Sequence, residues 1–333
     1  MIRHITVLGD GAMGTACALV LASKPELRVT IWSPLEDYGR LVQQHRESVR
    51  YLPGVRIPEN IHLTLDLGEA VNHADTLVLA IPTLYLRATL LRNADTLRSN
   101  SAAIVSVIKG IEQGTFLRPT QIMAEILGPR SYAVLAGPSH AEEISRGLPA
   151  SVVVASYDKS WAQTVQLLFM TERLRVYTNP DPVGVELCGA LKNIIAIAAG
   201  ISDGLGLGDN AKAALLTRAL VEMRRFVEAH GGRAETVYGL AGIGDLITTC
   251  TSVHGRNLRV GRAIGQGQKL ADILHTMQQT AEGIWTCHAV YHHASQLGLE
   301  MPISTEVYRI LYEDKPPLQA LRDLMHREPM PEY

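Results

Sequence analysis

The sequence predicts an α/β chain in which an N-terminal doubly wound sheet is followed by an all-helical C-terminal domain. Up to residue 180, short β-branched or apolar runs alternate with helical patterns, as in parallel βαβ units. From Asp181 onward the alternation stops and helical patterns follow one another. Pro180-Asp181-Pro182 is the best boundary signal. We therefore expect a dinucleotide-binding domain over residues 1–180 and a substrate-binding domain over residues 181–333.

The first strand pattern, Ile5–Leu8, leads into Gly9-Asp10-Gly11-Ala12-Met13-Gly14, and an apolar helix pattern follows over Thr15–Ala22. This is a GxGxxG motif between a strand and a helix. Its first glycine allows the tight turn, the second lets a pyrophosphate approach the backbone, and the third lets helix and strand pack closely. The motif predicts a dinucleotide site in a Rossmann-like sheet. A glycine-rich turn without a ligand is the alternative.

The second strand, Val29–Trp32, ends at Ser33-Pro34. NAD sites usually have an acidic residue here, which binds the ribose 2′-hydroxyl. Glu36 and Asp37 lie only beyond the proline, which favours NADPH slightly over NADH. The preference is slight because the nearest arginines are distant, at Arg40, Arg46 and Arg50.

After a polar helix and a proline-punctuated loop at 51–60, further strands and helices alternate. We expect strands at Thr76–Ile81, Ala102–Val107, Tyr132–Ala136 and Ser151–Ala155, with helices at Leu84–Leu97 and Arg118–Leu127 among them. Ligands of such sheets lie beyond the carboxyl ends of the strands. The residues that follow each strand are therefore candidates for the site.

Two strand ends carry polar residues. Lys109 comes directly after one strand, near where nicotinamide and substrate should meet, although a surface lysine in a turn is the alternative. Gly137-Pro138-Ser139-His140 follows the next strand, where the glycine allows close backbone approach and Ser139 can cap a helix. His140 could be a general base, but no carboxylate is evident to orient it.

The helical half begins with an apolar helix, Val183–Ile201, that contains Lys192 and Asn193. A lysine taken out of water without a partner is costly. Lys192 is therefore either a proton donor or acceptor in a dry cleft, or a lysine whose head reaches water from a helix end. Further helices are expected at Ala211–His230, Arg256–Ile264, Ala281–Leu297, Glu306–Tyr312 and Pro317–Met325.

Two loops of this half carry candidate residues. Asp245 ends a glycine-rich stretch at 239–245 and either orients a lysine, accepts from a substrate hydroxyl, or caps a helix. Gly255-Arg256-Asn257 opens a helix, where free N–H groups, the positive dipole end and an arginine make a phosphate clamp. An ordinary solvated arginine is the alternative.

Composition excludes several classes of function. The net charge of −2 gives no electrostatic basis for binding nucleic acid or an anionic membrane. Four scattered cysteines without a CxxC pair fit reduced thiols in a cytoplasmic protein. No apolar run suits a signal peptide or a membrane span. His288 and His292 could share a metal on one helix face, but no third ligand is suggested, so we expect none.

Several of these stretches together resemble one family. GDGAMG, YLPGVRIPEN, IKGIE, AGPSHAEEISRGLPA, GVELCGALKNIIAIAAGISDGLGLGDNAKAALLTR, GLAGIGDLITTCTS and GRN are similar, in order, to the signatures of the NAD(P)-dependent glycerol-3-phosphate dehydrogenases of the bacterial biosynthetic type. The resemblance implies reversible hydride transfer from NADPH or NADH to dihydroxyacetone phosphate. The product, sn-glycerol 3-phosphate, would supply phospholipid biosynthesis. The resemblance also implies that the protein is a homodimer.

The resemblance further implies roles for single residues. Lys192 resembles the catalytic acid/base, and Lys109 a second active-site lysine that touches both cofactor and substrate. The implied substrate contacts are Lys109, Gly137, Ser139, Lys192, Asp245, Gly255, Arg256 and Asn257. The implied cofactor contacts are Gly9, Gly11, Ala12, Met13, Gly14, Ser33, Lys109, Ala141, Arg256 and Glu282.

The chain departs from the family pattern at four positions. Met13 stands where an aromatic residue is usual, Ser33 where many members have a basic or polar residue, His140 in place of Phe, and Gly255 in place of Ser. Two other functions remain open from the residues alone. One is a two-domain dehydrogenase acting on a hydroxy acid or sugar acid, which would not need the phosphate clamp. The other is a regulatory protein that senses NAD(P)H, which would not need the two lysines and Asp245 together.

Overall fold

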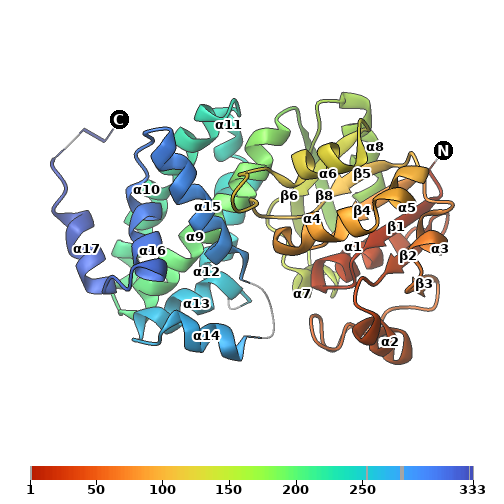
Figure 1. Cartoon of the computed structure of the whole chain (residues 1–333), viewed down its shortest axis with the longest axis horizontal. Coiled ribbons are helices and arrows are strands. Elements are labelled where there is room, and N and C mark those ends of the chain that lie inside the picture. Colours follow the sequence, from red (N-terminus) through yellow and green to blue (C-terminus); the bar gives the residue numbers. More distant parts are fainter. Residues whose placement is uncertain (1, 253, 278–280, 330, 333) are drawn as a thin grey trace.

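The computed structural model describes residues 2–252, 254–277, 281–329 and 331–332. A sheet with helices on both faces forms one half of the molecule, and helices alone form the other (Figure 1). The strands are β1 (His4–Leu8), β2 (Arg28–Trp32), β3 (Ile61–Thr64), β4 (Thr76–Leu79), β5 (Ala103–Ser106), β6 (Tyr132–Ala136), β7 (Ala150–Ala155) and β8 (Leu174–Asn179). The predicted doubly wound sheet followed by a helical domain is confirmed.

The strands form one sheet in the order β3-β2-β1-β4-β5-β6-β7-β8. The chain winds from β1 to one edge through β2 and β3, and then from β4 toward the other edge. The order therefore reverses between β1 and β4, and the crevice at such a switch point is where these sheets bind ligands. Gly9 follows β1 with a φ of 120°, and a Cβ there would lie 2.9 Å from the carbonyl oxygen of Ala80, after β4.

Helices bury both faces of the sheet. One face is covered by α1 (Ala12–Ala22), α2 (Glu36–His45) and α8 (Lys159–Phe169). The other face is covered by α3 (Leu67–Val71), α4 (Thr83–Arg92), α5 (Ala94–Ser99) and α6 (Pro119–Leu127). Strands buried on both sides are apolar throughout rather than alternating, which is why they were visible as continuous apolar runs.

The expectation of a wholly parallel sheet is wrong at β7. β7 pairs with β6 in the antiparallel sense, while β8 runs parallel to β7. The connection from β6 to β7 contains only the one-turn helix α7 (Ala141–Ile144), about 6 Å long. A crossover to a parallel neighbour usually contains a longer helix that packs on the sheet. Here the chain instead turns back at the same end of the sheet.

Several other elements differ from those predicted. β3 and β8 were not predicted, because both are edge strands in which apolar and polar residues alternate. The helix expected at Leu84–Leu97 is interrupted at Asn93, whose side chain donates a hydrogen bond to the Thr89 carbonyl oxygen at 2.8 Å. Such a bond competes with the helical backbone pattern.

In the helical half, α9 (Pro182–Gly204) lies at the centre (Figure 1). The other helices of this half are α10 (Gly208–Ala229), α11 (Ala234–Val237), α12 (Asp245–Thr251), α13 (Arg256–Gly265), α14 (Leu270–Thr276), α15 (Glu282–Gln296), α16 (Pro302–Tyr312) and α17 (Pro317–Met325). The expectation that no apolar run suits a membrane span is wrong for α9, which has the necessary length and hydropathy, although 94% of its apolar window is buried inside the molecule. α9 is the core helix of this half. All four cysteines are buried and unpaired, as predicted.

Glycines let α9 and α13 approach closely. A Cβ on Gly261 would lie 2.0 Å from the carbonyl oxygen of Ile197, and one on Gly200 would lie 2.2 Å from that of Leu258. Nothing larger than glycine fits these positions without moving the backbone. The close approach sets where the start of α13 stands relative to Lys192 on α9.

Candidate active site

The two candidate lysines meet at one carboxylate. The Lys192 amine donates to Asp245 Oδ1 at 2.6 Å, and the Lys109 amine donates to Asp245 Oδ2 at 2.8 Å. Lys192 and Asp245 are 5% and 2% exposed, respectively. Lys109 comes from the end of β5, Lys192 from the middle of α9, and Asp245 from the start of α12. These contacts exclude the alternative in which the Lys192 side chain reaches bulk water from a helix end.

The electrostatics of this corner follow from burial. Burial lowers the pKa of Lys192 to about 8, because loss of solvation outweighs the favourable charge of Asp245, and the Lys109 ammonium lowers it further. Burial by itself would raise the pKa of Asp245, but the two ammonium groups outweigh it and lower that pKa. The corner therefore contains one carboxylate shared by two amines, and its excess charge is positive.

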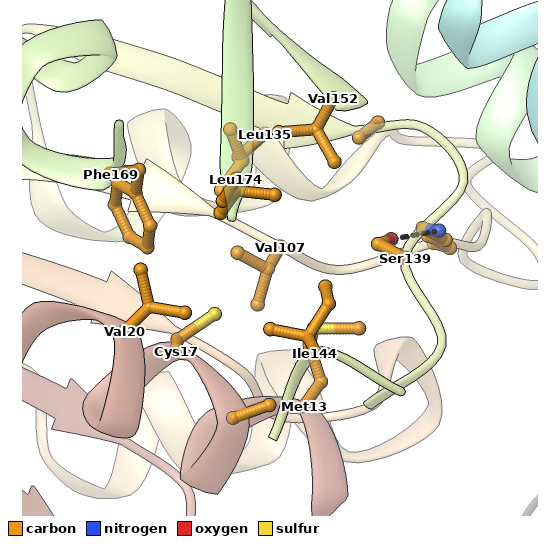
Figure 2. A pocket seen from close by; sticks show the side chains of 13 residues that line it. Met13, Cys17, Val20, Val107, Leu135, Ser139, Ile144, Val152, Phe169 and Leu174 are labelled. Atoms are coloured by element: carbon orange, nitrogen blue, oxygen red, sulfur yellow. Dashed lines mark hydrogen bonds between the residues drawn. The ribbon is translucent and has the colours of Figure 1, made fainter. Parts of the chain in front are cut away.

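The loop after β6 faces Lys109. Gly137 has a φ of 127°, and its carbonyl oxygen accepts a hydrogen bond from the Lys109 amine at 3.2 Å. The same amine donates to the Ser139 hydroxyl at 3.2 Å (Figure 2). A Cβ on Gly137 would lie 3.1 Å from the Cα of Val152. The loop thus needs glycine there for both its conformation and its packing.

The start of α13 forms a second corner. A Cβ on Gly255 would lie 2.9 Å from the Thr249 carbonyl oxygen, so glycine is required, and the usual serine would have to displace backbone. Asn257 is buried and its Oδ1 accepts from the Gly283 N–H at 3.1 Å. Arg256 is exposed. The first-turn N–H groups and this guanidinium together can bind an anionic phosphate.

Glu282 links this corner to the sheet. Its Oε1 accepts from the Thr83 N–H at 2.9 Å, at the start of α4. A Cβ on Gly110, the residue after Lys109, would lie 3.3 Å from the same oxygen. Burial raises the pKa of Glu282, while the charge of Arg256 opposes that rise. Glu282 therefore stands beside the strand end that carries Lys109.

The turn after β1 fits a dinucleotide pyrophosphate. A Cβ on Gly11 would meet no atom within 4 Å, whereas one on Gly14 would lie 2.0 Å from the carbonyl oxygen of Gly9. The turn is thus closed toward its own backbone and open at Gly11. The N–H groups of Ala12 and Met13, at the start of α1, have no intrahelical acceptor by helix geometry, so the open side suits an anion.

Three predicted cofactor contacts, Met13, Ala141 and Ser33, each have different surroundings. Met13 lines an apolar pocket between α1 and the ends of β5, β6 and β7, below the Ser139 loop (Figure 2). Ala141 is buried and packs against Ala16 of α1. Ser33, after β2, is far along the crevice from the lysines, and its hydroxyl donates to the Asp10 carboxylate. A dinucleotide bound along the crevice would be long enough to contact both the end of β2 and the corner that contains the lysines.

Comparison with known proteins matches both halves of the chain. A family model described as NAD-dependent glycerol-3-phosphate dehydrogenase N-terminus matches residues 4–162, and the corresponding C-terminus model matches residues 181–322. The chain belongs to the NAD-dependent glycerol-3-phosphate dehydrogenase family. The resemblance that the motifs indicated is therefore confirmed.

Relatives in this glycerol-3-phosphate dehydrogenase family match over the full chain. The protein named glycerol-3-phosphate dehydrogenase (NAD(P)+) from Geobacillus thermodenitrificans is 49% identical over 328 residues, covering 98% of this chain and 95% of the relative. The protein of the same name from Chlorobium phaeobacteroides (strain BS1) is 48% identical, covering 98% of each. The crystal structure of glycerol-3-phosphate dehydrogenase from Coxiella burnetii superposes with a TM-score of 0.93 at 38% identity, covering 98% of this chain and 99% of that one.

In this family member, the stretch expected as a glycine-rich loop is helical. Leu240–Gly244 forms a π-helical turn, η1, that continues into α12. Single π turns occur often at functional sites. A Cβ on Gly242 would lie 1.9 Å from the Val237 carbonyl oxygen, which explains the glycine. Asp245 is thus the first residue of a helix, aimed at the lysines, and not a helix cap.

The candidate histidines have other surroundings. The Nε2 atom of His140 is buried without a hydrogen-bond partner, and the His254 ring lies 5.9 Å away. Burial, with the charge of Lys192 next, lowers the pKa of His140. On α15, the rings of His288 and His292 lie 4.4 Å apart, beside Tyr308. Among the described residues, no three His, Cys, Asp or Glu side chains converge as metal ligands would.

Sequence reasoning missed three residues. The Thr249 hydroxyl accepts from the Lys192 amine at 2.6 Å; its position four residues after Asp245 puts both on one helix face and could have revealed it. Asn193 donates to the Lys109 carbonyl oxygen at 3.4 Å, and no signal beyond its polarity in an apolar helix pointed there. Asp10 lies inside the glycine motif, and nothing in the sequence indicates that its carboxylate accepts a hydrogen bond from Ser33.

Proposed function

We propose that this protein catalyses the reversible NAD(P)H-dependent reduction of dihydroxyacetone phosphate to sn-glycerol 3-phosphate, and so supplies glycerophospholipid biosynthesis. The observation that carries the proposal is the buried corner in which Lys109 and Lys192 share the Asp245 carboxylate. Membership of the glycerol-3-phosphate dehydrogenase family supports it. A nucleotide sensor would have no use for such a corner.

Lys192 is the proton donor to the substrate C2 oxygen in this proposal. Bound NAD(P)H supplies the hydride. Reduction places negative charge on the carbonyl oxygen, which needs a proton from a group whose pKa lies near the operating pH. A pKa of about 8 leaves the Lys192 amine largely protonated at neutral pH and still able to release its proton. Asp245 and Thr249 hold the amine in place.

Lys109 stabilises the same charge without giving up a proton. Its amine is held by Asp245, Gly137 and Ser139. Its positive charge also lowers the pKa of Lys192. We propose that Lys109 contacts both the substrate and the nicotinamide. Gly137 and Ser139, which lie beside Lys109, contact the substrate.

The phosphate of the substrate binds at the start of α13. Gly255 and Asn257 shape the turn, and Arg256 supplies the charge. A phosphate carries close to two negative charges, and a guanidinium binds it with paired hydrogen bonds. Binding at this end fixes the carbonyl carbon in one orientation, which lowers the entropic part of the barrier.

We propose that the dinucleotide binds at the turn after β1 and contacts residues on both sides of the crevice. The open side of Gly11 and the first turn of α1 support a pyrophosphate there. The proposed contacts are Gly9, Gly11, Ala12, Met13, Gly14, Ser33, Lys109, Ala141, Arg256 and Glu282.

The test is a pair of assays. Purified protein should oxidise NADH or NADPH when dihydroxyacetone phosphate is added, and should not respond to hydroxy acids or their keto acids. Lys192→Ala should lose at least about a hundredfold in kcat, as removal of a general acid does, while it still binds dinucleotide and unfolds at a similar temperature. Near-normal turnover in that variant would remove Lys192 from the mechanism. Absence of any turnover in the wild type would favour the sensor.

We also propose assignments for the domains, the localisation and the partners. Residues 1–180 and 181–333 are the dinucleotide-binding and substrate-binding domains, supported by the end of β8 at Asn179 and the start of α9 at Pro182. The protein binds neither nucleic acid nor membrane, in keeping with its near-neutral charge and with the burial of its one long apolar helix among the described residues. Its assignment as a cytoplasmic homodimer rests on the family resemblance alone.

A further inference from the structure

The turn after β1 carries an acidic side chain between its first two glycines. Asp10 is 4% exposed, and its Oδ2 accepts a hydrogen bond from the hydroxyl of Ser33, the first residue after β2. The carboxylate therefore stands at the adjoining carboxyl ends of β1 and β2. Neither the glycine motif nor its spacing requires an acidic residue at this position.

This position is where the adenosine ribose of a dinucleotide lies in a doubly wound sheet. An acidic residue at the end of the second strand, about 20 residues after the glycine motif, accepts from the ribose 2′-hydroxyl in NAD-dependent proteins of this fold. Here that place in the sequence holds Ser33. The carboxylate is nevertheless present in space, because Asp10 provides it from the neighbouring strand end.

The carboxylate is held rigidly. The Asp10 carbonyl oxygen accepts from the Ser48 hydroxyl at 2.8 Å and from the Thr15 hydroxyl at 3.3 Å. Helix α2 lies close behind Ser33, since a Cβ on Gly39 would lie 2.6 Å from the Ser33 hydroxyl oxygen. Ser33 in turn donates to Asp10 and orients it. Backbone and side chain of Asp10 are thus both fixed before any ligand binds.

The nearby arginines, by contrast, are engaged with protein groups. Arg40 pairs with Glu36 on the exposed face of α2. Arg46 donates to the backbone carbonyl oxygen of Ile57 in the loop before β3, at 3.2 Å, and to that of Ile61, the first residue of β3, at 2.7 Å. The Arg50 guanidinium lies over the Tyr38 ring, 5.2 Å from its centre. A 2′-phosphate needs a cation at this end of the site, and each of these three guanidinium groups is already in contact with protein groups.

We propose that Asp10 determines the dinucleotide specificity of this protein and selects NADH over NADPH, with Ser33 as its positioning residue. A carboxylate accepts a strong hydrogen bond from the 2′-hydroxyl of NADH, whereas it repels the doubly charged 2′-phosphate of NADPH. The inference rests on the proposed function for the presence of the dinucleotide. It reverses the slight preference for NADPH that the absence of an acid after β2 indicated.

The experiment measures binding of each dinucleotide without substrate. NADH and NADPH are titrated separately into the full-length protein, and dissociation constants are read from quenching of tryptophan fluorescence. The wild type should bind NADH about 10- to 100-fold more tightly than NADPH, the range expected for a hydrogen bond to a charged group. Asp10→Asn, which keeps the shape and removes the charge, should reduce that ratio at least about tenfold. Ser33→Ala should reduce it less.

Arg50→Ala is the matched control, because it changes a charge near the same end of the site. It should leave the NADH-to-NADPH ratio within about twofold of the wild type. Equal or tighter binding of NADPH by the wild type, an unchanged ratio in Asp10→Asn, or selective loss of NADPH binding in Arg50→Ala would each overturn the proposal. If Asp10→Asn fails to fold, as judged by thermal unfolding, the wild-type ratio and Ser33→Ala decide.

Failure of the proposed function gives a different result. A protein that prefers NADH but never reduces dihydroxyacetone phosphate would keep the specificity of Asp10 and lose the enzymatic assignment. A protein that reduces dihydroxyacetone phosphate yet binds NADPH more tightly would keep the enzymatic assignment and lose the role of Asp10.

Discussion

Replacing Asp245 by Asn removes the charge that both amines of the candidate site share. Asp245 Oδ1 lies 2.6 Å from the Lys192 amine, and this carboxylate raises the pKa of Lys192 against the effect of burial. With an effective dielectric constant of about 20, two unit charges at that separation interact by about 6 kcal/mol before desolvation is counted. A nearby opposite charge in proteins shifts a pKa by about 1 to 3 pH units. We therefore expect the pKa of Lys192 in Asp245→Asn to fall from about 8 to about 6.

The sign of the pH dependence follows from the role of the ammonium as donor. Reduction needs protonated Lys192, so activity is present below its pKa and is lost as the pH rises through it. At pH 7 a group with a pKa of about 8 is about nine-tenths protonated, and one with a pKa of about 6 is about one-tenth protonated. The variant should thus lose about tenfold in kcat/KM at pH 7 from protonation alone. Lowering the pH should restore part of that loss.

The assay is the pH profile of kcat/KM for dihydroxyacetone phosphate at saturating NADH, followed by loss of NADH absorbance. The substrate phosphate also titrates, but it does so equally for both proteins and cancels in the ratio. Thr249→Val is the control, since it removes a neutral acceptor 2.6 Å from the same amine and leaves the carboxylate. A midpoint that stays near its wild-type value in Asp245→Asn, or moves upward, would refute the electrostatic account of Lys192.

Three further predictions test other parts of the molecule. Gly11→Ala should weaken dinucleotide binding at least about tenfold with unchanged thermal unfolding, because the new methyl group meets no protein atom and enters the pyrophosphate space; unaltered affinity in a titration would show that the pyrophosphate lies elsewhere. Arg118→Ala should lower the free energy of unfolding by about 3 kcal/mol in denaturant titrations, since it leaves the buried Glu186 carboxylate without its cation, whereas Arg40→Ala, in an exposed pair, should change it by less than about 0.5 kcal/mol. Arg256→Ala should raise KM for dihydroxyacetone phosphate at least about tenfold with a smaller change in kcat, and an unchanged KM in steady-state assays would contradict the phosphate clamp.

Much of the sheet could be predicted because its strands are buried on both faces. β1, β2, β4, β5 and β6 were expected within one or two residues of their observed bounds. The direction of β7 could not be predicted, because a strand has the same apolar pattern whichever way it runs. Its direction depends on the path of the preceding connection, which contains only the four-residue helix α7 and returns at the same end of the sheet.

The candidate site shows the same division. Lys109, Lys192 and Asp245 were each identified as candidates from local sequence, as a polar residue at a strand end, inside an apolar helix and after a glycine-rich stretch. Their meeting could not be predicted, since Asp245 is 53 residues from Lys192 and 136 residues from Lys109. The contact between Asp10 and Ser33 was equally hidden, because a residue inside a turn motif can point to either side.

By itself the sequence determined where strands, helices and the phosphate-binding turn occur, because those depend on apolar period, on glycine and on residues only a few positions apart. Tertiary structure alone decided the charge state of the site. Whether the lysine amine in α9 reaches water or a carboxylate depends on how α9, α12 and the end of β5 pack together. Packing therefore turns a costly buried lysine into an amine with a pKa of about 8, close enough to neutral pH to exchange a proton with a substrate.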